Sequence, residues 1–347
     1  MSDPGSFAGV HGTSTAGQTH TRRDFLTGAS TARDRIDDYW IKVHRRAMAC
    51  RFEITLASED AAGIAAARAA LNEIDRVEDA LTVFRDTSTV SRLNRIAHSG
   101  PVVVDEDLFS LLCACAALHR ETERAFDITS TPLSRCWGFL QREGRLPEPD
   151  AIEAARARVG AGAILLDEVH QSVWFDRPGL ELNFGAIGKG YALDRVRSML
   201  RRGGVSHALL SAGRSSLLAV GGRSGGWQVE VVSPQIDRPL ARVWLRNAAL
   251  GTSGAGEQFV VVNGTRFGHV IDPRTGWPAS GIVSASAIAS SAARADALST
   301  AFLIGGIDLA ERYCARHANV MALITPEGMR TPLVIGTHPG ARIEVAA

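Results

Sequence analysis

Two residues in one predicted helix have the types and the spacing of a metal site. In the segment ARADALSTAF, Asp296 and Thr300 lie four residues apart, so a helix places both on one face among small and apolar neighbours. A carboxylate that faces a core needs a partner, and Mg²⁺ binds oxygen ligands while keeping positions open for phosphate oxygens. The alternative is an Asp that faces solvent and a Thr that bonds to the preceding helical turn. Taken alone, the segment favours that alternative.

A second segment, NFGAIGKGYALDR, surrounds Lys189 with Gly185, Gly188 and Gly190, directly after an expected strand and at the start of a helix. Glycines let the backbone approach a ligand closely, a helix N-terminus attracts phosphate, and the lysine adds positive charge. These features suit a nucleotide phosphate. The spacing is neither that of a Walker A loop nor that of G-x-G-x-x-G, and a tight strand-to-helix turn is the simpler explanation of the segment alone.

A third segment, RFGHVIDPRTGWP, holds Arg266, His269, Asp272 and Arg274 within nine residues, before a Pro/Gly turn. A strand would point His269 and Ile271 to one face and Asp272 to the other. A histidine or a carboxylate can act as a base at neutral pH. Asp272 can instead cap the backbone ahead of the turn, and the cluster leaves both interpretations open.

These segments lie among alternating strand and helix patterns. Strands are expected at 48–57, 163–167, 172–176, 180–184, 227–232 and 241–246. Helices are expected at 58–84 with Ser58 as N-cap, from Asp105 to about Glu123, and at 187–202, 291–304 and 308–317, with glycine pairs at 203–204 and 305–306 as stops. The chain has no internal repeat and no linker after residue 40, so one mixed α/β domain fits better than two.

The composition excludes some classes of function. The 347 residues include 38 Lys and Arg and 37 Asp and Glu, and 45% of them are hydrophobic. This balance indicates a globular core and provides no general field for nucleic acid, so phosphate binding must be local. No apolar run approaches the ~18 residues that span a bilayer. The five cysteines show no metal or disulfide spacing, and we interpret them as mostly buried thiols.

The first 36 residues differ from the rest, because they are rich in Gly, Ser, Thr, Ala and charge. We predict a disordered tail at 1–36 and a folded domain at 37–347. The stretch TRRDFL is similar to a twin-arginine export pattern, but the residues after it, TGASTARDRIDDYW, are polar and charged where that signal needs an apolar segment. No cysteine suited to lipid attachment lies near the N-terminus, so we expect a cytoplasmic protein.

Five segments, taken together and in order, resemble one family. They are TVFRDTSTVSRLN, FDITSTPLSRCWGF, GAIGKGYALDRV, DPRTGWP after a histidine, and ADALSTAF, and they resemble the FAD:protein FMN transferases, the ApbE-like family. The resemblance runs from about Met48 to the last strands. It implies an α/β (mixed α+β) fold, with a single ApbE-like, T-fold-like domain of mixed, largely antiparallel sheets and packed helices. It also implies Mg²⁺-dependent transfer of FMN from the donor FAD to a Thr or Ser hydroxyl of a protein, with release of AMP.

The resemblance implies roles for particular residues. The metal ligands would be Asp296, Thr300 and a backbone carbonyl, which we place at Gly188. The flavin-binding positions would include Met48, Phe84, Trp137, Gly138, Phe139, Lys189, Ala192 and Arg266, and the catalytic region would include His269 and Asp272. These types suit the reaction, because a metal with Lys189 or Arg266 can neutralise charge on the pyrophosphate, and no covalent protein nucleophile is required.

The chain departs from the family's pattern at four places. Met48-Ala49-Cys50 stands where Met-Gly-Thr is common, Phe84 replaces a tyrosine, Asn183 replaces an aspartate, and Gly213-Arg214-Ser215 replaces a Gly-Gly-Asp-like stretch. Phe84 can still stack on a flavin without a hydroxyl contact, whereas Asn183 removes a charge near the expected metal. The intact Asp296 and Thr300 keep a metal-dependent activity the leading interpretation.

Three functions therefore remain: FMN transfer to a partner protein, hydrolysis of FAD to FMN and AMP at the same metal site, and flavin binding without catalysis.

The N-terminal tail contains a candidate acceptor. Acceptors of the family resemble Asp-x-x-Thr/Ser-Gly-Ala-Thr/Ser, and DFLTGAS, from Asp24 to Ser30, fits this pattern with Thr27 as the hydroxyl. Chance in a tail of this composition, or an eroded export signal, explains the same residues without any flavin.

Overall fold

A large antiparallel sheet forms the centre of the molecule. The computed structural model describes residues 40–222, 225–233, 236–254, 259–262 and 264–346. The sheet has eight strands in the order β1-β2-β6-β7-β10-β13-β14-β15, and all neighbours are antiparallel. The strands are β1 (Trp40–Ala47), β2 (Cys50–Ala57), β6 (Ala208–Ala212), β7 (Ser216–Val220), β10 (Ala249–Gly254), β13 (Ile282–Ala289), β14 (Met321–Pro326) and β15 (Leu333–Gly336).

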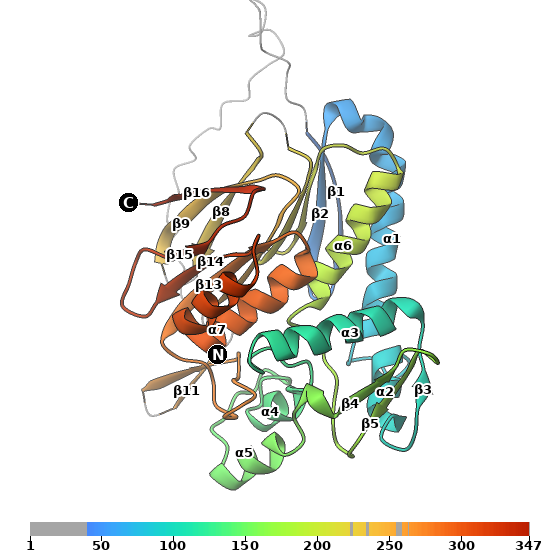
Figure 1. Cartoon of the computed structure of the whole chain (residues 1–347), viewed down its shortest axis with the longest axis vertical. Coiled ribbons are helices and arrows are strands. Elements are labelled where there is room, and N and C mark those ends of the chain that lie inside the picture. The colour runs from blue at the N-terminus through green and yellow to red at the C-terminus, as the bar shows by residue number, and fades with distance from the viewer. Residues whose placement is uncertain (1–39, 223–224, 234–235, 255–258, 263, 347) are drawn as a thin grey trace, which may run out of the picture. The chain divides into compact units, whose positions relative to one another are not determined.

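Three helices cover one face of this sheet (Figure 1). They are α1 (Ile64–Leu81), α6 (Gly188–Arg202) and α7 (Ala292–Arg316). Helix α6 packs against both α1 and α7, and α7 lies on β10 and β13. Small side chains, such as the fully buried Ala192 and Ala295, keep these elements close together. The start of α6 and the first half of α7, which carry two of the predicted site segments, are therefore neighbours.

A three-stranded antiparallel sheet covers the other face. Its order is β16 (Ala341–Val345), β9 (Ile236–Leu245) and β8 (Trp227–Ser233). Val229 and Val243 from this sheet share a buried cluster with Leu250 and Ile288 from the large sheet. In β10, Leu250 faces this cluster, while the next residue, Gly251, lies against α7, as the alternation of a strand requires.

The chain between α1 and α6 forms a second region, in the lower part of Figure 1. It contains α2 (Thr89–Ile96), β3 (Val102–Val103), α3 (Glu106–Glu121), α4 (Thr131–Cys136), α5 (Pro149–Arg156), β4 (Ile164–Asp167) and β5 (Ser172–Phe175). Strands β3, β5 and β4 form a small antiparallel sheet. A separate hairpin of β11 (Phe259–Val262) and β12 (Thr265–Gly268) contributes Val260 and Phe267 to a buried cluster around Trp137.

The mixed α/β class and the largely antiparallel sheets are confirmed, and most expected elements are present. The strand expected at 180–184 is wrong. Its backbone groups bond outside any ladder: the N–H of Asn183 donates to the carbonyl of Ile128 at 2.7 Å, and the N–H of Leu182 donates to the side chain of Asn94 at 2.7 Å. The segment is apolar because it crosses the core as a loop.

Ser58 as the N-cap of the first long helix is also wrong. Residues 58–63 form a 3₁₀ segment, and α1 begins at Ile64 after Gly63. The carboxylate of Asp60 accepts a hydrogen bond from the backbone N–H of His207 at 2.9 Å, which ties this segment to the chain before β6. This tertiary contact, which the local pattern does not reveal, delays the start of the α-helix.

Helix α7 joins the two helices expected at 291–304 and 308–317. Gly306 has φ 67° and ψ −159°, which is not helical, so the element consists of two helices across a sharp break. Only glycine adopts this conformation readily. The glycine pair therefore interrupts the helix as predicted without starting a separate element.

The five cysteines are free thiols, as expected, but only Cys115 is fully buried. Cys50, Cys113, Cys136 and Cys314 keep partial exposure, because each lies near the edge of its cluster rather than at its centre. Among the described residues, no helix has both the length and the apolarity that crossing a membrane requires.

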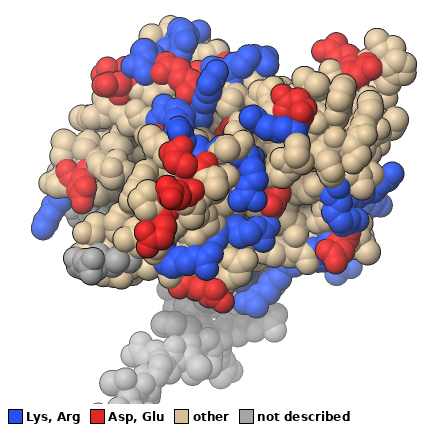
Figure 2. Space-filling model, turned by 90° about the horizontal axis from the view of Figure 1, so that it is seen from below, with Lys and Arg blue, Asp and Glu red and all other residues tan. Residues whose placement is uncertain are grey.

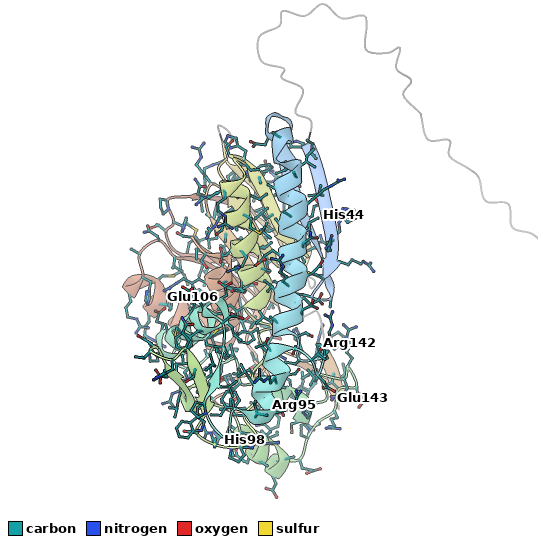
Figure 3. The ribbon with its side chains drawn as sticks, turned by 90° about the vertical axis from the view of Figure 1, so that its right-hand side faces the viewer. His44, Arg95, His98, Glu106, Arg142 and Glu143 are labelled. Carbon is teal, nitrogen blue, oxygen red and sulfur yellow. The ribbon has the colours of Figure 1, made fainter. Side chains whose placement is uncertain are left out.

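Strand β1 is an edge of the large sheet, and its side chains alternate. Lys42, His44 and Arg46 are exposed, whereas Ile41 and Val43 pack against the core. Figure 3 shows β1 beside α1, with His44 pointing away from the helix. The alternation is that of a strand covered on one face only.

The turn between β1 and β2 holds two residues in the left-handed region. Ala47 pairs with Cys50, so Met48 and Ala49 form a two-residue loop, with φ of 48° and 58°. This conformation matches the primed turns that favour Asn and Gly. A Cβ in this region costs about 1 kcal/mol, so the loop is strained where the resemblance places a flavin-binding position.

We expect Ala49→Gly to stabilise the protein by about 1 kcal/mol, because the glycine adopts the same φ without a Cβ penalty. Urea denaturation of the two proteins measures the difference. Ala69→Gly, at an exposed position within α1, is the matched control and is expected to destabilise by about 1 kcal/mol. A loss of stability in Ala49→Gly would show that the turn is not strained.

Candidate active site

Asp296 is the buried centre of the candidate site. Its side chain lies on the first half of α7, is 6% exposed, and accepts a hydrogen bond from the backbone N–H of Gly190 at 2.7 Å. Glycines make this approach possible: a Cβ at Gly190 would lie 2.1 Å from the carbonyl oxygen of Ala292, and one at Gly251 would lie 2.5 Å from the carbonyl of Ala295. The start of α6 and strand β10 therefore both press against the backbone of α7 around Asp296.

The electrostatic environment of Asp296 is unfavourable for an isolated carboxylate. Burial raises its pKa to about 7, and the nearby Lys189 and the N–H of Gly190 oppose this only in part. The hydroxyl of Ser216 is near enough to favour the ionised acid, yet it is buried and has no partner at normal hydrogen-bond geometry. A buried acid beside an unsatisfied hydroxyl is the arrangement that a bound cation would complete.

Thr300 lies one helical turn after Asp296 and faces the same side. Its hydroxyl is 3.4 Å from the carbonyl oxygen of Asp296 and 3.1 Å from the hydroxyl of Ser253 on β10. Ser299 joins the group, because its hydroxyl lies 2.9 Å from that of Ser253. The solvent-facing alternative for Asp296 is therefore excluded, whereas Thr300 does lie near the preceding turn of its helix.

Lys189, in the first turn of α6, connects Asp296 to the turn between β6 and β7. Its Nζ donates to the hydroxyl of Ser215. A Cβ on Gly213, in the same turn, would lie 3.4 Å from the Cβ of Cys50 at the start of β2. Burial raises the pKa of the Cys50 thiol, with Lys189 opposing and Asp296 reinforcing the shift. These residues come from four separate segments and form one polar cluster.

Met48 lies in the turn of the first hairpin, and Phe84 lies in the chain just after α1. The backbone N–H of Met48 donates to Oε1 of Glu78 at 2.9 Å, which fixes the strained turn to α1. Phe84 follows the end of α1 and is 76% exposed. An aromatic ring this exposed has apolar area available for stacking on a planar ligand.

His269 and Asp272 follow β12, and their surroundings differ. His269 is half-buried. The carboxylate of Asp272 accepts from the backbone N–H of Arg274 at 2.9 Å and pairs with Nη2 of Arg274 at 2.8 Å. Asp272 thus has the capping role that the sequence left open, and its carboxylate is already held within the turn.

Trp137, Gly138 and Phe139 do not line an open surface. Trp137 is fully buried, donates through Nε1 to the carbonyl of Gly276 at 2.9 Å, and packs on Phe139 and Phe267. The aromatic residues of the CWGF stretch therefore belong to a core cluster that supports the turn after His269. Contact between the Trp137 ring and a ligand would require this cluster to open.

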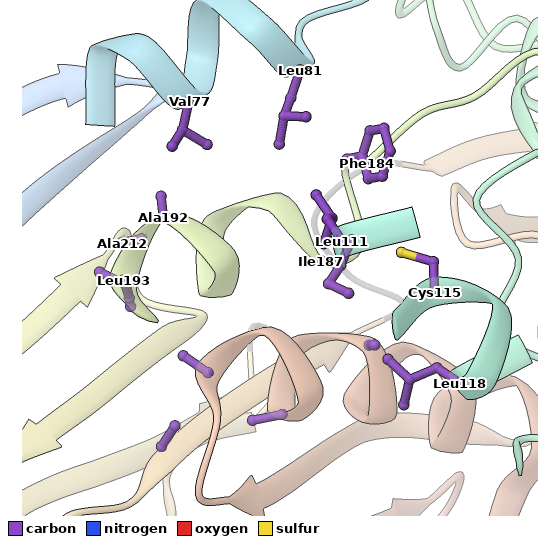
Figure 4. Packing of buried hydrophobic residues seen from close by; sticks show 14 of the residues in the cluster. Val77, Leu81, Leu111, Cys115, Leu118, Phe184, Ile187, Ala192, Leu193 and Ala212 are labelled. Atoms are coloured by element: carbon purple, nitrogen blue, oxygen red, sulfur yellow. The ribbon is translucent and has the colours of Figure 1, made fainter. Parts of the chain in front are cut away.

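Three further residues for which the resemblance implies a role lie at clearly different places in the structure. Ala192 is fully buried between α6 and its neighbours, facing the same core as Val77 and Leu81 of α1 (Figure 4). Gly188 is buried in the first turn of α6. Arg266 lies on the exposed hairpin, with its guanidinium 3.6 Å from the ring centre of Phe259. Ala192 thus contributes packing, while Gly188 lies two residues from the N–H that binds Asp296.

The oxygen atoms around Asp296 fit a hard cation. A carboxylate oxygen of Asp296 and the hydroxyls of Thr300 and Ser253 are the donor types that Mg²⁺ prefers. Among the described residues, no group of three or more His, Cys, Asp or Glu side chains is placed to hold a metal. A cation here therefore relies on one carboxylate with neutral oxygens, and needs further ligands from water or a substrate phosphate.

A family model that matches most of the chain identifies the family to which the chain belongs. Residues 48–324 match the model of the ApbE family. The chain belongs to the ApbE family. A relative from Klebsiella pneumoniae, named FAD:protein FMN transferase, is 33% identical to this chain over 207 residues. The match covers 59% of this chain and 64% of the relative, so the chain spans slightly less than two thirds of that relative's length. One of the same name from Escherichia coli is 28% identical over 264 residues, covering 74% of this chain and 75% of the relative.

Solved structures agree with this assignment. The ApbE protein of Thermotoga maritima superposes on this chain with a TM-score of 0.77 at 29% identity, covering 89% of this chain and 97% of that protein. The ApbE-family fold accounts for the shared order of helices and sheets. At three of the expected departures the structure shows the local contacts: Cys50 lies beside Gly213, the hydroxyl of Ser215 accepts from Lys189, and the side chain of Asn183 accepts from the N–H of Gly185 at 2.8 Å.

Sequence reasoning missed several residues of this ApbE-family site. Ser216 and Ser253 lie on neighbouring strands of the sheet, and Glu78 lies on α1. Nothing in their local sequence distinguishes them from other serines and glutamates. A signal existed only for Gly251, since it is a glycine inside a strand that needs none for a turn.

We expect Mg²⁺ to raise the melting temperature of the wild-type protein and not that of Asp296→Asn. Without metal, ionising Asp296 costs stability, because its pKa is raised from 3.8 to about 7 in the folded state. Below the unfolded-state pKa of 3.8 the acid is neutral in both the folded and the unfolded protein, so it costs no stability. The loss of stability grows between this pKa and the folded-state pKa of about 7, and it is complete above the latter. The Mg²⁺ effect should accordingly be larger at pH 8 than at pH 5. An equal effect on the variant would contradict the assignment.

Proposed function

We propose that this ApbE-family protein transfers FMN from FAD to a Thr or Ser hydroxyl of a protein and releases AMP. The observation that carries the proposal is the buried Asp296 beside Lys189, in a cluster with oxygen ligands suited to a cation. The relatives named FAD:protein FMN transferase support it.

Asp296, Thr300 and a backbone carbonyl, which we place at Gly188, would hold Mg²⁺. When bound, the ion supplies positive charge that stabilises the phosphate oxygens. Lys189 adds a second positive charge to the same region, since its Nζ is held by Ser215. Lys189 would bind the diphosphate of FAD, and Met48 and Phe84 would contact its flavin.

The accepting hydroxyl oxygen forms a bond to the phosphorus of the FMN half, and the bond to the AMP phosphate breaks. His269 accepts the hydroxyl proton, and AMP leaves. Asp272 keeps the turn after His269 in shape through Arg274, so its carboxylate has a positioning role. Trp137 supports the same turn through the carbonyl of Gly276.

One experiment separates this function from the two alternatives. The purified protein is incubated with FAD, Mg²⁺ and a candidate acceptor, and the products are separated by chromatography. AMP together with protein-bound flavin fluorescence is expected for transfer. Equal amounts of free FMN and AMP would indicate hydrolysis, and unchanged FAD would indicate binding without catalysis.

Thr27 is the acceptor that the chain itself offers, although it lies outside the described residues. Twelve residues lie between it and Trp40, and an extended chain over these thirteen Cα-to-Cα steps spans up to about 45 Å. Strand β1, with its eight residues, covers about 27 Å from Trp40 towards Met48. The length of the segment thus allows Thr27 to reach the site of its own chain or of a second copy.

We expect intact-mass measurement, after incubation with FAD and Mg²⁺, to show an added FMN on the wild-type protein and none on Thr27→Ala. Thr21→Ala, in the same segment, is the matched control and keeps the added mass. An unchanged wild-type mass in a preparation that flavinylates another acceptor would eliminate Thr27.

A cytoplasmic location remains our prediction, and it determines which acceptors the enzyme meets. Cell fractionation with antibodies to the protein tests it. Recovery from a periplasmic fraction in a form cleaved before Tyr39 would contradict it.

A further inference from the structure

A cavity of about 1000 Å³ opens between the C-terminal end of α3, helix α5 and the turn at Pro273 and Arg274. None of Lys189, Asp296 and Thr300 lines it. Its lining includes five arginines and one histidine, which are His119, Arg120, Arg124, Arg156, Arg177 and Arg274. The cavity is thus separate from the candidate active site and is rich in hydrogen-bond donors.

His119 forms a buried and oriented part of the cavity wall. The residue is 7% exposed, and its Nδ1 lies 2.9 Å from the carbonyl oxygen of Phe126 and 3.3 Å from Oδ2 of Asp127. Both neighbours are acceptors, so Nδ1 carries the proton in the neutral ring. Nε2 then carries the lone pair, and it has no protein partner among the described residues. The wall therefore offers one oriented acceptor to a ligand.

The four carboxylates that line the cavity are already engaged, Asp176 with Nε of Arg177 at 3.7 Å. Glu153 pairs with Arg156 at 2.8 Å. Glu123 pairs with Arg312 at 2.7 Å, which lies outside the lining. Asp127 accepts from the backbone N–H of Ala161 at 3.0 Å, besides its contact with His119.

Arg120 and Arg124, in contrast, have no carboxylate partner within the described part of the chain. Elsewhere on the surface, positive and negative side chains are interspersed, as Figure 2 shows for the underside. No carboxylate of the cavity wall pairs with these two guanidinium groups. An anion can therefore accept their hydrogen bonds without competing with a carboxylate.

The backbone at this edge is strained. Glu123 and Arg124 follow α3 with φ of 54° and 67°, a conformation that costs a non-glycine residue roughly 1 kcal/mol. The N–H of Arg124 donates to the carbonyl of His119 at 2.9 Å, so the tight turn joins these two residues of the wall. The chain keeps an arginine where a glycine would be more stable.

We infer that this cavity is a second ligand site, for a small phosphate ester that carries a free hydroxyl group. Arg120 and Arg124 bind the phosphate, and Nε2 of His119 accepts the hydrogen bond of the hydroxyl. The site shares a wall with the turn after His269, because Nη1 of Arg156 donates to the carbonyl of Arg274 at 2.9 Å. The inference does not rest on the proposed transferase activity.

Calorimetric titration of the full chain tests the inference, with glycerol 3-phosphate and inorganic phosphate as probes and no divalent metal present. We expect glycerol 3-phosphate to bind more tightly than inorganic phosphate. Arg124→Gly is expected to weaken both at least tenfold without lowering the melting temperature, because glycine relieves the strained φ. Arg120→Ala is expected to weaken both as well.

Two controls separate this site from others. Arg68→Ala removes an exposed arginine of α1 that does not line the cavity, and Lys189→Ala removes the cation at the candidate active site; both are expected to keep the binding. Absent binding in the wild type, full binding in Arg124→Gly, or loss of binding in Lys189→Ala alone would overturn the inference. Equal affinity for the two probes would overturn the contact between the hydroxyl and His119.

Discussion

Replacing Asp296 by alanine is expected to lower AMP release from FAD in Mg²⁺ by at least about a hundredfold. Among the described residues, the variant removes the one carboxylate of the oxygen cluster formed with Thr300 and Ser253, so the cation loses this charged ligand. The N–H of Gly190 loses its acceptor too. Chromatographic measurement of AMP over time, at saturating FAD, gives the rate.

Asp308→Ala is the matched control, because Asp308 is an exposed aspartate in the second half of the same helix. It is expected to keep the wild-type rate. Circular dichroism of both variants establishes that α7 remains folded. Undiminished AMP release by Asp296→Ala in Mg²⁺ would mean that the metal assignment is wrong.

Gly190→Ala should unfold the protein at much lower urea concentration than the wild type, with a loss of about 3 kcal/mol or more. The added Cβ would lie 2.1 Å from the carbonyl oxygen of Ala292 and 2.6 Å from the backbone nitrogen of Ala293. Backbone atoms of a buried helix cannot move aside as a side-chain end can. Helices α6 and α7 must separate, so the contact with Asp296 is lost as well.

Gly162→Ala is the control for this substitution. No atom lies within 4 Å of the Cβ that would be added at Gly162, and the change is expected to be close to neutral. The midpoints of urea denaturation, compared at equal slopes, give the difference in free energy of unfolding. A stable Gly190→Ala with normal Mg²⁺ response would show that the two helices are less tightly packed than described.

Features of the site that depend on local spacing were predictable from sequence. Asp296 and Thr300 share a helix face because they are four residues apart, and Lys189 opens α6 because glycines precede it. The break of α7 at Gly306 follows from glycine chemistry in the same way. Each of these inferences needs only neighbours in the chain.

The rest depends on contacts between distant segments. Ser216 and Ser253 reach Asp296 and Thr300 through the order of strands β7 and β10, which no local pattern specifies. The resemblance implies that Trp137 binds the flavin, and no local pattern reveals that its ring is buried against Phe267. The loop at 180–184 was mistaken for a strand because apolar runs are common to both.

The alternation along β1 also bears on how copies of this protein behave in a crowded solution. An edge strand presents unpaired N–H and C=O groups that can recruit a strand from another molecule and start aggregation. The outward residues of β1 include Lys42 and Arg46, so two copies that met edge to edge would bring like charges together. Within the part of the chain that the structure describes, no further strand pairs with β1, and its cationic side chains disfavour pairing with a strand of another copy.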